Sequence, residues 1–165
     1  MADAVCHHYW DASALVKVIA NDADEAMNRT AVREYFHNNG LHNATSYCLA
    51  EALSALKSKW LRKRITQAEY FDDVREFFRL VVPCLTQVDV PLAGRIRTNA
   101  ERMMEAHGLD FIDAIQLATV VYGRESIFVA GSKTLFITAD HALAVAAEQE
   151  GARVWECTKV FPPWG

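Results

Sequence analysis

The chain has 165 residues, of which 52% are hydrophobic and 23% are charged, with seven Gly and four Pro. This length suits one domain with a sizeable core, and this composition excludes disordered and fibrous proteins. The net charge of −4 argues against a surface with general affinity for nucleic acids, and the four cysteines lack the CxxC pairs typical of zinc knuckles.

The first part of the chain alternates extended stretches with helices. A strand from about Val5 to Trp10 leads into a helix over DASALVKVIAN, for which Asp11 or Ser13 is the expected cap. The segment DADEAMNRTAVREYFHNNG (22–40) indicates a second helix that stops at Gly40.

A brief strand from His42 to Thr45 comes next, with Ser46 as the expected N-cap of the following helix. That helix carries apolar residues at spacings of three and four, namely Leu49, Leu53, Leu56 and Trp60. A further helix begins near Thr66, with a predicted buried stripe of Phe71, Val74, Phe78 and Val81.

The alternation continues to the end of the chain. The stretch CLTQVDV (84–90) resembles a strand, and a helix from about Pro91 to His107 precedes a helix in GLDFIDAIQLATVVY (108–122). Residues Leu135 to Thr138 then predict a buried strand, HALAVAAEQEG (141–151) a helix, and ARVWEC (152–157) a last strand.

Strands that alternate with helices predict an α/β fold with a mainly parallel sheet of about four to five strands, flanked by helices on both faces. We expect a single domain over 1–165, since no linker or internal repeat divides the chain. A basic-then-apolar leader and a membrane-spanning run are both missing, so we expect a cytoplasmic location and no membrane contact.

Two aspartates stand at the head of the apolar run 108–122. Asp110 is well explained as a helix N-cap, and Asp113 three residues later resembles the partner position of a capping box. Asp113 lies on a helix that is apolar nearly all round, which predicts burial. An ionised carboxylate in that setting needs a cation or a metal as its partner.

Three further acids occur at positions that matter in such a fold. Asp11 and Asp140 each follow a strand, and each taken singly is better explained as a helix cap. Glu51 lies opposite the apolar stripe of its helix, so taken alone it resembles a solvent-exposed residue. In a parallel sheet, however, these three acids can meet Asp113 at the carboxyl edge, where ligands bind. Such an oxygen-only ligand set suits Mg²⁺ or Mn²⁺ and the hydrolysis of a phosphodiester.

Four segments in this order resemble the PIN-domain ribonucleases, and among them the VapC-type toxins: YWDASALVKV, TSYCLAEALSAL, LDFIDAIQLAT and FITADHALAVAAEQEGARV. The resemblance extends from about Tyr9 to Val154. Two places depart from the family pattern. The first strand, VCHHYW, has two histidines and a tryptophan instead of an aliphatic run, and His141 follows the last aspartate.

The resemblance implies a PIN-like domain that cleaves RNA with metal-activated water. It implies that Asp11, Glu51, Asp113 and Asp140 are the catalytic acids and hold one or two Mg²⁺ or Mn²⁺ ions. Ser13 would help to order the site, with Asp110 in support. It also implies a homodimer and a small VapB-like antitoxin that inserts an arginine-bearing tail into the acidic groove.

The run KSKWLRKR (57–64) is the obvious basic surface that could steer RNA past these acids. Its basic residues are Lys57, Lys59, Arg62, Lys63 and Arg64. A run of this kind at the end of a helix is also commonly just solvated.

Three other functions remain open from the sequence. One is a PIN nuclease that is not a toxin. Another is an aspartyl-phosphate protein of the receiver or phosphohydrolase kind, although Ser13 stands where a phosphohydrolase would have a second Asp. The third is a binding module whose carboxylates only cap helices.

Overall fold

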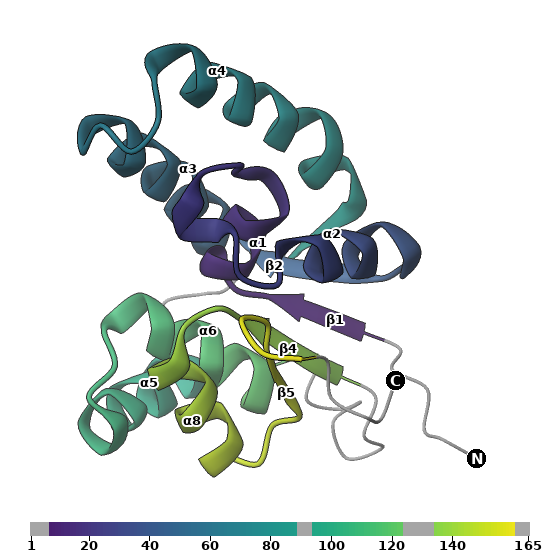
Figure 1. Cartoon of the computed structure of the whole chain (residues 1–165). Coiled ribbons are helices and arrows are strands. Elements are labelled where there is room, and N and C mark those ends of the chain that lie inside the picture. The colour runs from purple at the N-terminus through teal and green to yellow at the C-terminus, as the bar shows by residue number, and fades with distance from the viewer. Residues whose placement is uncertain (1–6, 89–93, 124–133, 161–165) are drawn as a thin grey trace.

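The computed structural model describes residues 7–88, 94–123 and 134–160 (Figure 1). Its centre is a sheet of five parallel strands in the order β3-β2-β1-β4-β5. The strands are β1 (His7–Trp10), β2 (His42–Thr45), β3 (Leu85–Val88), β4 (Thr134–Thr138) and β5 (Val154–Glu156). The predicted α/β fold with a parallel sheet is therefore confirmed.

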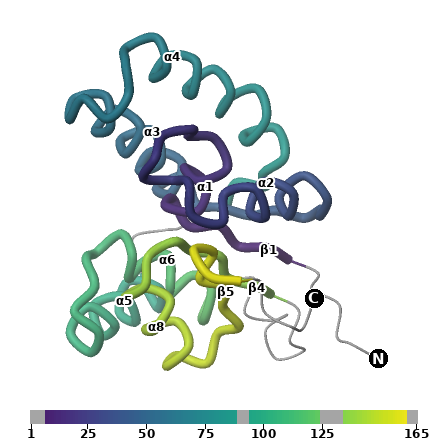
Figure 2. Tube along the Cα trace, in the orientation of Figure 1, coloured from purple at the N-terminus to yellow at the C-terminus, as the bar shows by residue number. Residues whose placement is uncertain are grey.

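Helices cover both faces of the sheet, as the ribbon and the chain trace show (Figures 1 and 2). One layer holds α1 (Ala12–Ile19), α2 (Arg29–Asn38), α3 (Ser46–Leu61) and α4 (Gln67–Glu76). The other holds α5 (Gly94–His107), α6 (Phe111–Tyr122) and α8 (His141–Gln149). Each layer buries its own apolar cluster against the sheet, because a parallel sheet must be covered on both sides. No helix in the described ranges is long and apolar enough to span a membrane.

The predicted helix over 22–40 is shorter in the structure. A 3₁₀ turn, η1 (Ala23–Glu25), comes first, and α2 begins only at Arg29. Asn28 separates η1 from α2 because its backbone is left-handed, with φ 56°. This conformation interrupts a regular helix, and Asn adopts it more readily than most residues. The periodicity of the sequence could not reveal this break.

Helix α3 begins one residue earlier than its predicted cap implies. Thr45 is the N-cap, and its Oγ1 accepts a hydrogen bond from the backbone N–H of Cys48 over 3.0 Å. Ser46 is the first helical residue instead. The hydroxyl that caps the helix thus belongs to the last residue of β2, so strand and helix join without a connecting loop.

The predicted apolar stripe of α4 is wrong in half of its positions. Phe77 and Val81 are buried, whereas Phe71 and Phe78 are 45% and 55% exposed. A π-helical turn, η2 (Phe77–Val81), continues α4 and adds a residue to the turn, so simple 3.6-residue counting fails there. A 3₁₀ turn, η3 (Val82–Cys84), then leads into β3.

The other predicted elements agree with the structure where it describes them. Gly108 has φ +67° and follows α5 as a left-handed C-terminal residue, as its position suggested. The predicted starts at Val5 and Pro91, and the end of the strand at 89–90, lie outside the described residues.

Candidate acidic site at the carboxyl edge of the sheet

Three strands deliver their C-terminal ends to one edge of the sheet. β1 ends beside Asp11, β2 runs into α3, and β4 ends just before Asp140. Within the sheet, β2 and β3 lie on one side of β1, whereas β4 and β5 lie on its other side. The edge between β1 and β4 is therefore a topological switch point, where open α/β sheets bind their ligands.

Asp11 lies at the centre of this edge and is 3% exposed. As N-cap of α1 it accepts a hydrogen bond at Oδ2 from the backbone N–H of Ser13, over 3.1 Å. The Ser13 hydroxyl donates to the same oxygen, as does Thr138 Oγ1 over 3.0 Å. Burial raises the pKa of Asp11, and these hydrogen bonds oppose that rise. The carboxylate is thus held in a fixed orientation.

Ser13 links the two strands of the switch point. Its Oγ accepts a hydrogen bond from the backbone N–H of Ala139 over 2.8 Å, while Thr138 Oγ1 accepts one from the backbone N–H of Asp140 over 3.0 Å. The Ser13 hydroxyl therefore contacts both Asp11 and the backbone just after β4. Thr138, buried at the end of β4, is a second ordering residue that the sequence did not single out.

Glu51 and Asp113 approach Asp11 from α3 and α6, two helices on opposite faces of the sheet. One carboxylate oxygen from each of the three residues lies within 4.8 Å of the others. Glu51 is half-buried, although helical periodicity placed it on a solvent-exposed face, because α6 packs beside that face of α3.

Burial, and then the charge of Asp11 and other acids, raises the pKa of Glu51 to about 7 and that of Asp113 to about 7. Burial favours the neutral acid, and mutual repulsion adds to this. A bound cation would reverse both effects, because it stabilises the ionised forms. The three acids are therefore a donor set that fits a hard divalent cation.

Gln116 is a polar member of the site that the sequence reading missed. It is fully buried on α6, and its Nε2 donates to Asp11 Oδ1 over 3.0 Å and to Glu51 Oε2 over 3.3 Å. Its Oε1 is buried with no hydrogen-bond partner among the described residues. A Gln one turn after Asp113 on an otherwise apolar helix was the available signal, since buried amides need partners.

Asp140 and Asp110 lie at the rim of the site. Asp140 caps α8 through a 2.9 Å hydrogen bond from the backbone N–H of Leu143, and Asp110 caps α6 through one of 2.9 Å from that of Asp113. Both are exposed. Each is near enough for its charge to raise the pKa of Asp113, but neither belongs to the close trio.

The basic run 57–64 spans the C-terminal end of α3. Lys57, Arg62, Lys63 and Arg64 are exposed, whereas Lys59 forms ion pairs with Asp22 at 3.0 Å and Glu25 at 2.9 Å. At 1.5 Å of rise per residue, Arg62 lies about 16 Å along the helix axis from Glu51. Arg62, Lys63 and Arg64 therefore lie just past the C-terminal end of α3, whereas Lys57 is only about 9 Å along the axis from Glu51.

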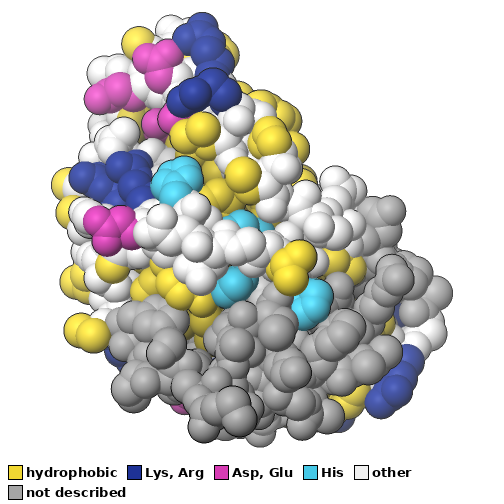
Figure 3. Space-filling view, turned by 90° about the vertical axis from the view of Figure 1, so that its right-hand side faces the viewer, with side chains coloured by type: hydrophobic (Ala, Val, Ile, Leu, Met, Phe, Trp, Pro, Cys, Tyr) yellow, Lys and Arg dark blue, Asp and Glu magenta, His cyan; other side chains and the backbone are white. Residues whose placement is uncertain are grey.

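The unusual histidines of β1 lie at the opposite edge of the sheet, where histidine side chains are visible in Figure 3. Nδ1 of His8 is 2.8 Å from the carbonyl oxygen of Gly40, and burial lowers the His8 pKa to about 4. Trp10 Nε1 donates to His42 Nδ1 over 3.0 Å. The two histidines thus lie away from the acids, whereas Trp10 directly precedes Asp11 and reaches back to His42.

His141 is the first residue of α8 and is 71% exposed in its side chain. Its Nδ1 lies 2.9 Å from Glu156 Oε2. The ring therefore joins α8 to β5 at the surface.

Two solved structures share this architecture. PAE2754 from Pyrobaculum aerophilum matches with a TM-score of 0.60 and 18% identity over 90% of this chain and 83% of its own. FitAcB from Neisseria gonorrhoeae matches with a TM-score of 0.59 and 10% identity over 93% of this chain and 99% of its own. The fold is PIN-like. No protein-family model and no curated protein matches the sequence.

The chain thus shares its fold with these two proteins, and it gathers Asp11, Glu51 and Asp113 at one edge of its sheet. Such low identities demonstrate a shared fold and carry no activity with them. The chemical argument therefore depends on the acids themselves.

Proposed function

We propose that this chain is a Mg²⁺- or Mn²⁺-dependent endoribonuclease of the VapC type, which cleaves RNA phosphodiester bonds with metal-activated water. The observation that carries the proposal is the convergence of Asp11, Glu51 and Asp113 within 4.8 Å at the switch point of the sheet. Like charges so close together are unfavourable unless they serve a cation.

Asp11, Glu51 and Asp113 would hold the ion, with Asp140 contributing from the rim. A bound divalent cation supplies a water of lowered pKa and offsets charge that develops on the phosphate. Ser13 and Thr138 fix Asp11 by donating to Oδ2. Gln116 holds Oδ1 of Asp11 and Oε2 of Glu51 on one amide group, which keeps both carboxylates directed at the same point.

RNA cleavage by the Asp113→Asn variant tests this proposal. Loss of a ligand should reduce Mn²⁺-dependent cleavage by more than the roughly 10- to 100-fold that loss of a supporting residue costs. Glu148→Gln, which removes one exposed charge from α8, is the matched control and should cleave normally. Undiminished cleavage by Asp113→Asn would refute the proposed site.

Thermal unfolding with and without Mn²⁺ separates a nuclease from a module whose acids only cap helices. A metal that binds the folded state alone raises stability, by about 2.7 kcal/mol at a hundredfold excess over Kd. The capping alternative predicts no shift at millimolar metal. Intact mass after incubation with a phosphoryl donor tests the aspartyl-phosphate alternative, because only that class gains a phosphoryl group.

The finer VapC assignment includes a homodimer and a small VapB-like antitoxin whose arginine enters the acidic groove. Arginine suits that role because its guanidinium pairs bidentately with carboxylates. A short reading frame directly upstream, whose product co-purifies with this chain and suppresses cleavage, would support it. A monomeric mass in light scattering and the absence of such a gene would favour a PIN nuclease that is not a toxin.

A further inference from the structure

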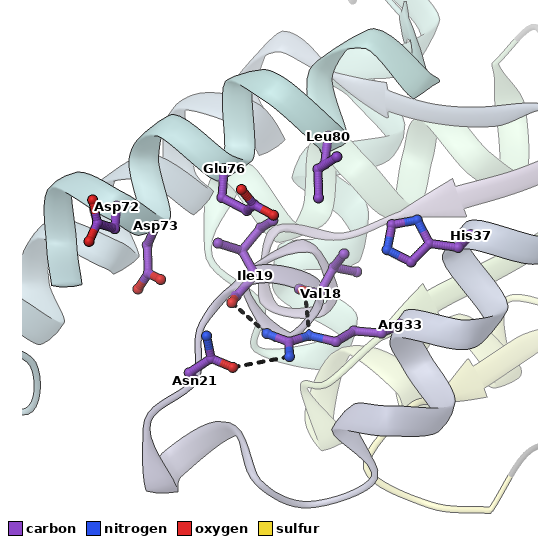
Figure 4. Close-up of a pocket in the computed structure, with 9 residues that line it drawn as sticks. All are labelled: Val18, Ile19, Asn21, Arg33, His37, Asp72, Asp73, Glu76 and Leu80. Carbon is purple, nitrogen blue, oxygen red and sulfur yellow. Dashed lines mark hydrogen bonds between the residues drawn. The ribbon is translucent and has the colours of Figure 1, made fainter.

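A polar pocket lies at the other end of α1 from Asp11. It has a volume of about 300 Å³ and opens between the end of α1, helix α2 and helix α4 with its π-helical extension (Figure 4). Its wall includes the aliphatic side chains of Val18, Ile19 and Leu80. It also includes the carboxylates of Asp72, Asp73 and Glu76.

Asp73 is the unusual member of this wall. It is only 8% exposed, yet no described residue forms a hydrogen bond or an ion pair with its carboxylate, which points from α4 into the pocket (Figure 4). The neighbouring acids are satisfied, since Asp72 pairs with Arg75 at 2.7 Å and Glu76 with Arg79 at 2.9 Å. The Asp73 oxygens are open to the pocket rather than sealed in the core, so they are free to accept hydrogen bonds from an incoming cation.

The charges around Asp73 do not supply that partner. Burial raises the Asp73 pKa to about 6, the charges of Asp22, Glu69 and Asp72 add to the rise, and only Arg33 opposes it. Asp22 itself has a buried oxygen, Oδ2, that lacks a hydrogen bond among the described residues. Oδ1 of Asp22 is paired with Lys59, so of the charges that act on Asp73 itself only Arg33 is positive. The exposed His37 of α2 also lines the pocket.

Arg33 is occupied elsewhere. Its Nε donates to the carbonyl oxygen of Val18 over 2.6 Å and its Nη2 to that of Ile19 over 2.5 Å. Its Nη1 donates to Asn21 Oδ1 over 3.0 Å (Figure 4). The guanidinium therefore caps the C-terminal end of α1, where positive charge is favourable. An entering anion would find most of these donors in use, whereas an entering cation would find the Asp73 acceptor free.

We propose that this pocket binds an organic cation, whose ammonium or guanidinium group donates hydrogen bonds to Asp73 while its aliphatic stem packs on Val18, Ile19 and Leu80. A long basic side chain of another protein and a free polyamine share this chemistry. A divalent metal is a poorer fit, because it needs several oxygen ligands, and within the described ranges only Asp11, Glu51 and Asp113 bring three ligands together. The proposal is independent of the nuclease function.

Titration with n-butylguanidinium, followed by amide NMR shifts, tests the pocket. We expect saturable shifts at Ile19, Asn21 and Asp73, and none with n-butylurea, the uncharged analogue of the same shape. Asp73→Asn should bind roughly tenfold more weakly, because it removes a charge-assisted hydrogen bond. Glu34→Gln is the matched control, since Glu34 is an exposed acid of α2 that does not line the pocket, and this variant should bind within about twofold of wild type. Equal binding by Asp73→Asn, or no saturation in wild type, would overturn the proposal.

Thermal unfolding gives a second readout that a structural role for Asp73 would not produce. Asp73→Asn should raise the melting temperature of the free protein, because it removes a partly desolvated charge that Asp22, Glu69 and Asp72 repel. Butylguanidinium should then stabilise wild type but not the variant. If Asp73 instead supports the fold through Arg33, the variant melts lower and the ligand stabilises neither protein, which overturns the proposal.

The two sources of the cation are distinguished by a capped tripeptide with one central arginine and by spermidine. Tighter binding of the peptide assigns the pocket to a partner chain, and tighter binding of spermidine assigns it to a free polyamine. Either order supports the pocket if Asp73→Asn weakens the preferred ligand. Failure of both ligands overturns it.

Discussion

Gln116 donates a hydrogen bond from Nε2 to Oδ1 of Asp11 over 3.0 Å, from a side chain that is completely buried on α6. The same nitrogen lies 3.3 Å from Oε2 of Glu51. One amide therefore joins two acids from two other segments, and it does so with donors that no aliphatic residue at this position could provide.

Replacing Gln116 by Leu should destabilise the metal-free protein by about 1–3 kcal/mol, because the buried carboxylate of Asp11 loses a donor while its desolvation remains. Denaturant unfolding measures this. Gln149→Leu, at an exposed position on α8, is the control and should change the free energy of unfolding by less than about 0.5 kcal/mol. Equal losses in the two variants would mean that the amide bridge does not stabilise the site.

The contribution of Glu51 and Asp113 to the stability of the metal-free protein should fall as pH rises from about 4.5 to about 7, whereas His8, with its lowered pKa, contributes in the opposite direction. The pKa values of Glu51 and Asp113 are raised to about 7 by burial and neighbouring acids, from ordinary values of 4.5 and 3.8. Across this window the folded state retains protons that the unfolded chain has lost, so each step up in pH favours unfolding. Melting temperatures measured without metal at several pH values test this.

The matched control for the pH series is the Glu51→Gln, Asp113→Asn double variant, whose stability should depend less steeply on pH over the same window. Stabilisation of the wild type by Mn²⁺ should grow as pH approaches about 7.5, because metal binding needs ionised carboxylates. Identical pH slopes in wild type and double variant would contradict the raised pKa values.

Much of this site was predictable because its anchors are local. Asp11 and Asp140 follow strands and precede helices, and both caps form as the sequence suggests. Parallel strand order then brings their ends to one edge without any detailed knowledge of packing. The fold class was predictable for the same reason, since alternation of strands and helices is visible in the chain itself.

The rest depends on contacts between segments far apart in sequence. Helix α6 covers the side of α3 that carries Glu51 and that periodicity predicts to be exposed to solvent. Gln116 becomes a site residue only through hydrogen bonds to Glu51 and Asp11, which are 65 and 105 residues away in the sequence. Lys59 looked like part of a free basic run, but Asp22, 37 residues earlier, accepts a hydrogen bond from it. No periodicity within one helix carries such information.

Mutation can test directly which side chains of η2, the π-helical continuation of α4, face the core. Phe77→Ala should cost about 3–5 kcal/mol, because Phe77 is 1% exposed and its removal leaves a cavity. Phe78→Ala should cost less than about 1 kcal/mol, since Phe78 is 55% exposed. Each variant is the other's control, as the two residues are adjacent and identical. Similar losses would show that the π-helical turn does not set the buried face.

Lys59→Gln should lower stability and leave RNA affinity nearly unchanged. Its side chain is 13% exposed, and its ammonium lies between Asp22 and Glu25, whose hydrogen bonds outweigh burial and raise the Lys59 pKa. Removing it leaves Asp22 without its cation, whereas Glu25 keeps an ion pair with Lys17 at 3.3 Å. Lys57→Gln, on the same helix but exposed, is the comparison and should leave stability unchanged. A large affinity loss in Lys59→Gln alone would show that these ion pairs open to bind RNA.

RNA binding should depend on salt through the exposed end of α3. Replacing Lys57, Arg62, Lys63 and Arg64 by Gln should weaken binding and flatten the slope of log affinity against log salt, by about 0.7 for each phosphate of single-stranded RNA that the variant no longer neutralises. Filter binding at several salt concentrations, with the catalytically silent Asp113→Asn background, measures the slope. The control replaces four exposed arginines elsewhere, Arg75, Arg79, Arg95 and Arg97, and so changes net charge equally. If both sets flatten the slope to the same extent, the attraction comes from overall charge and the basic run has no special part in binding RNA.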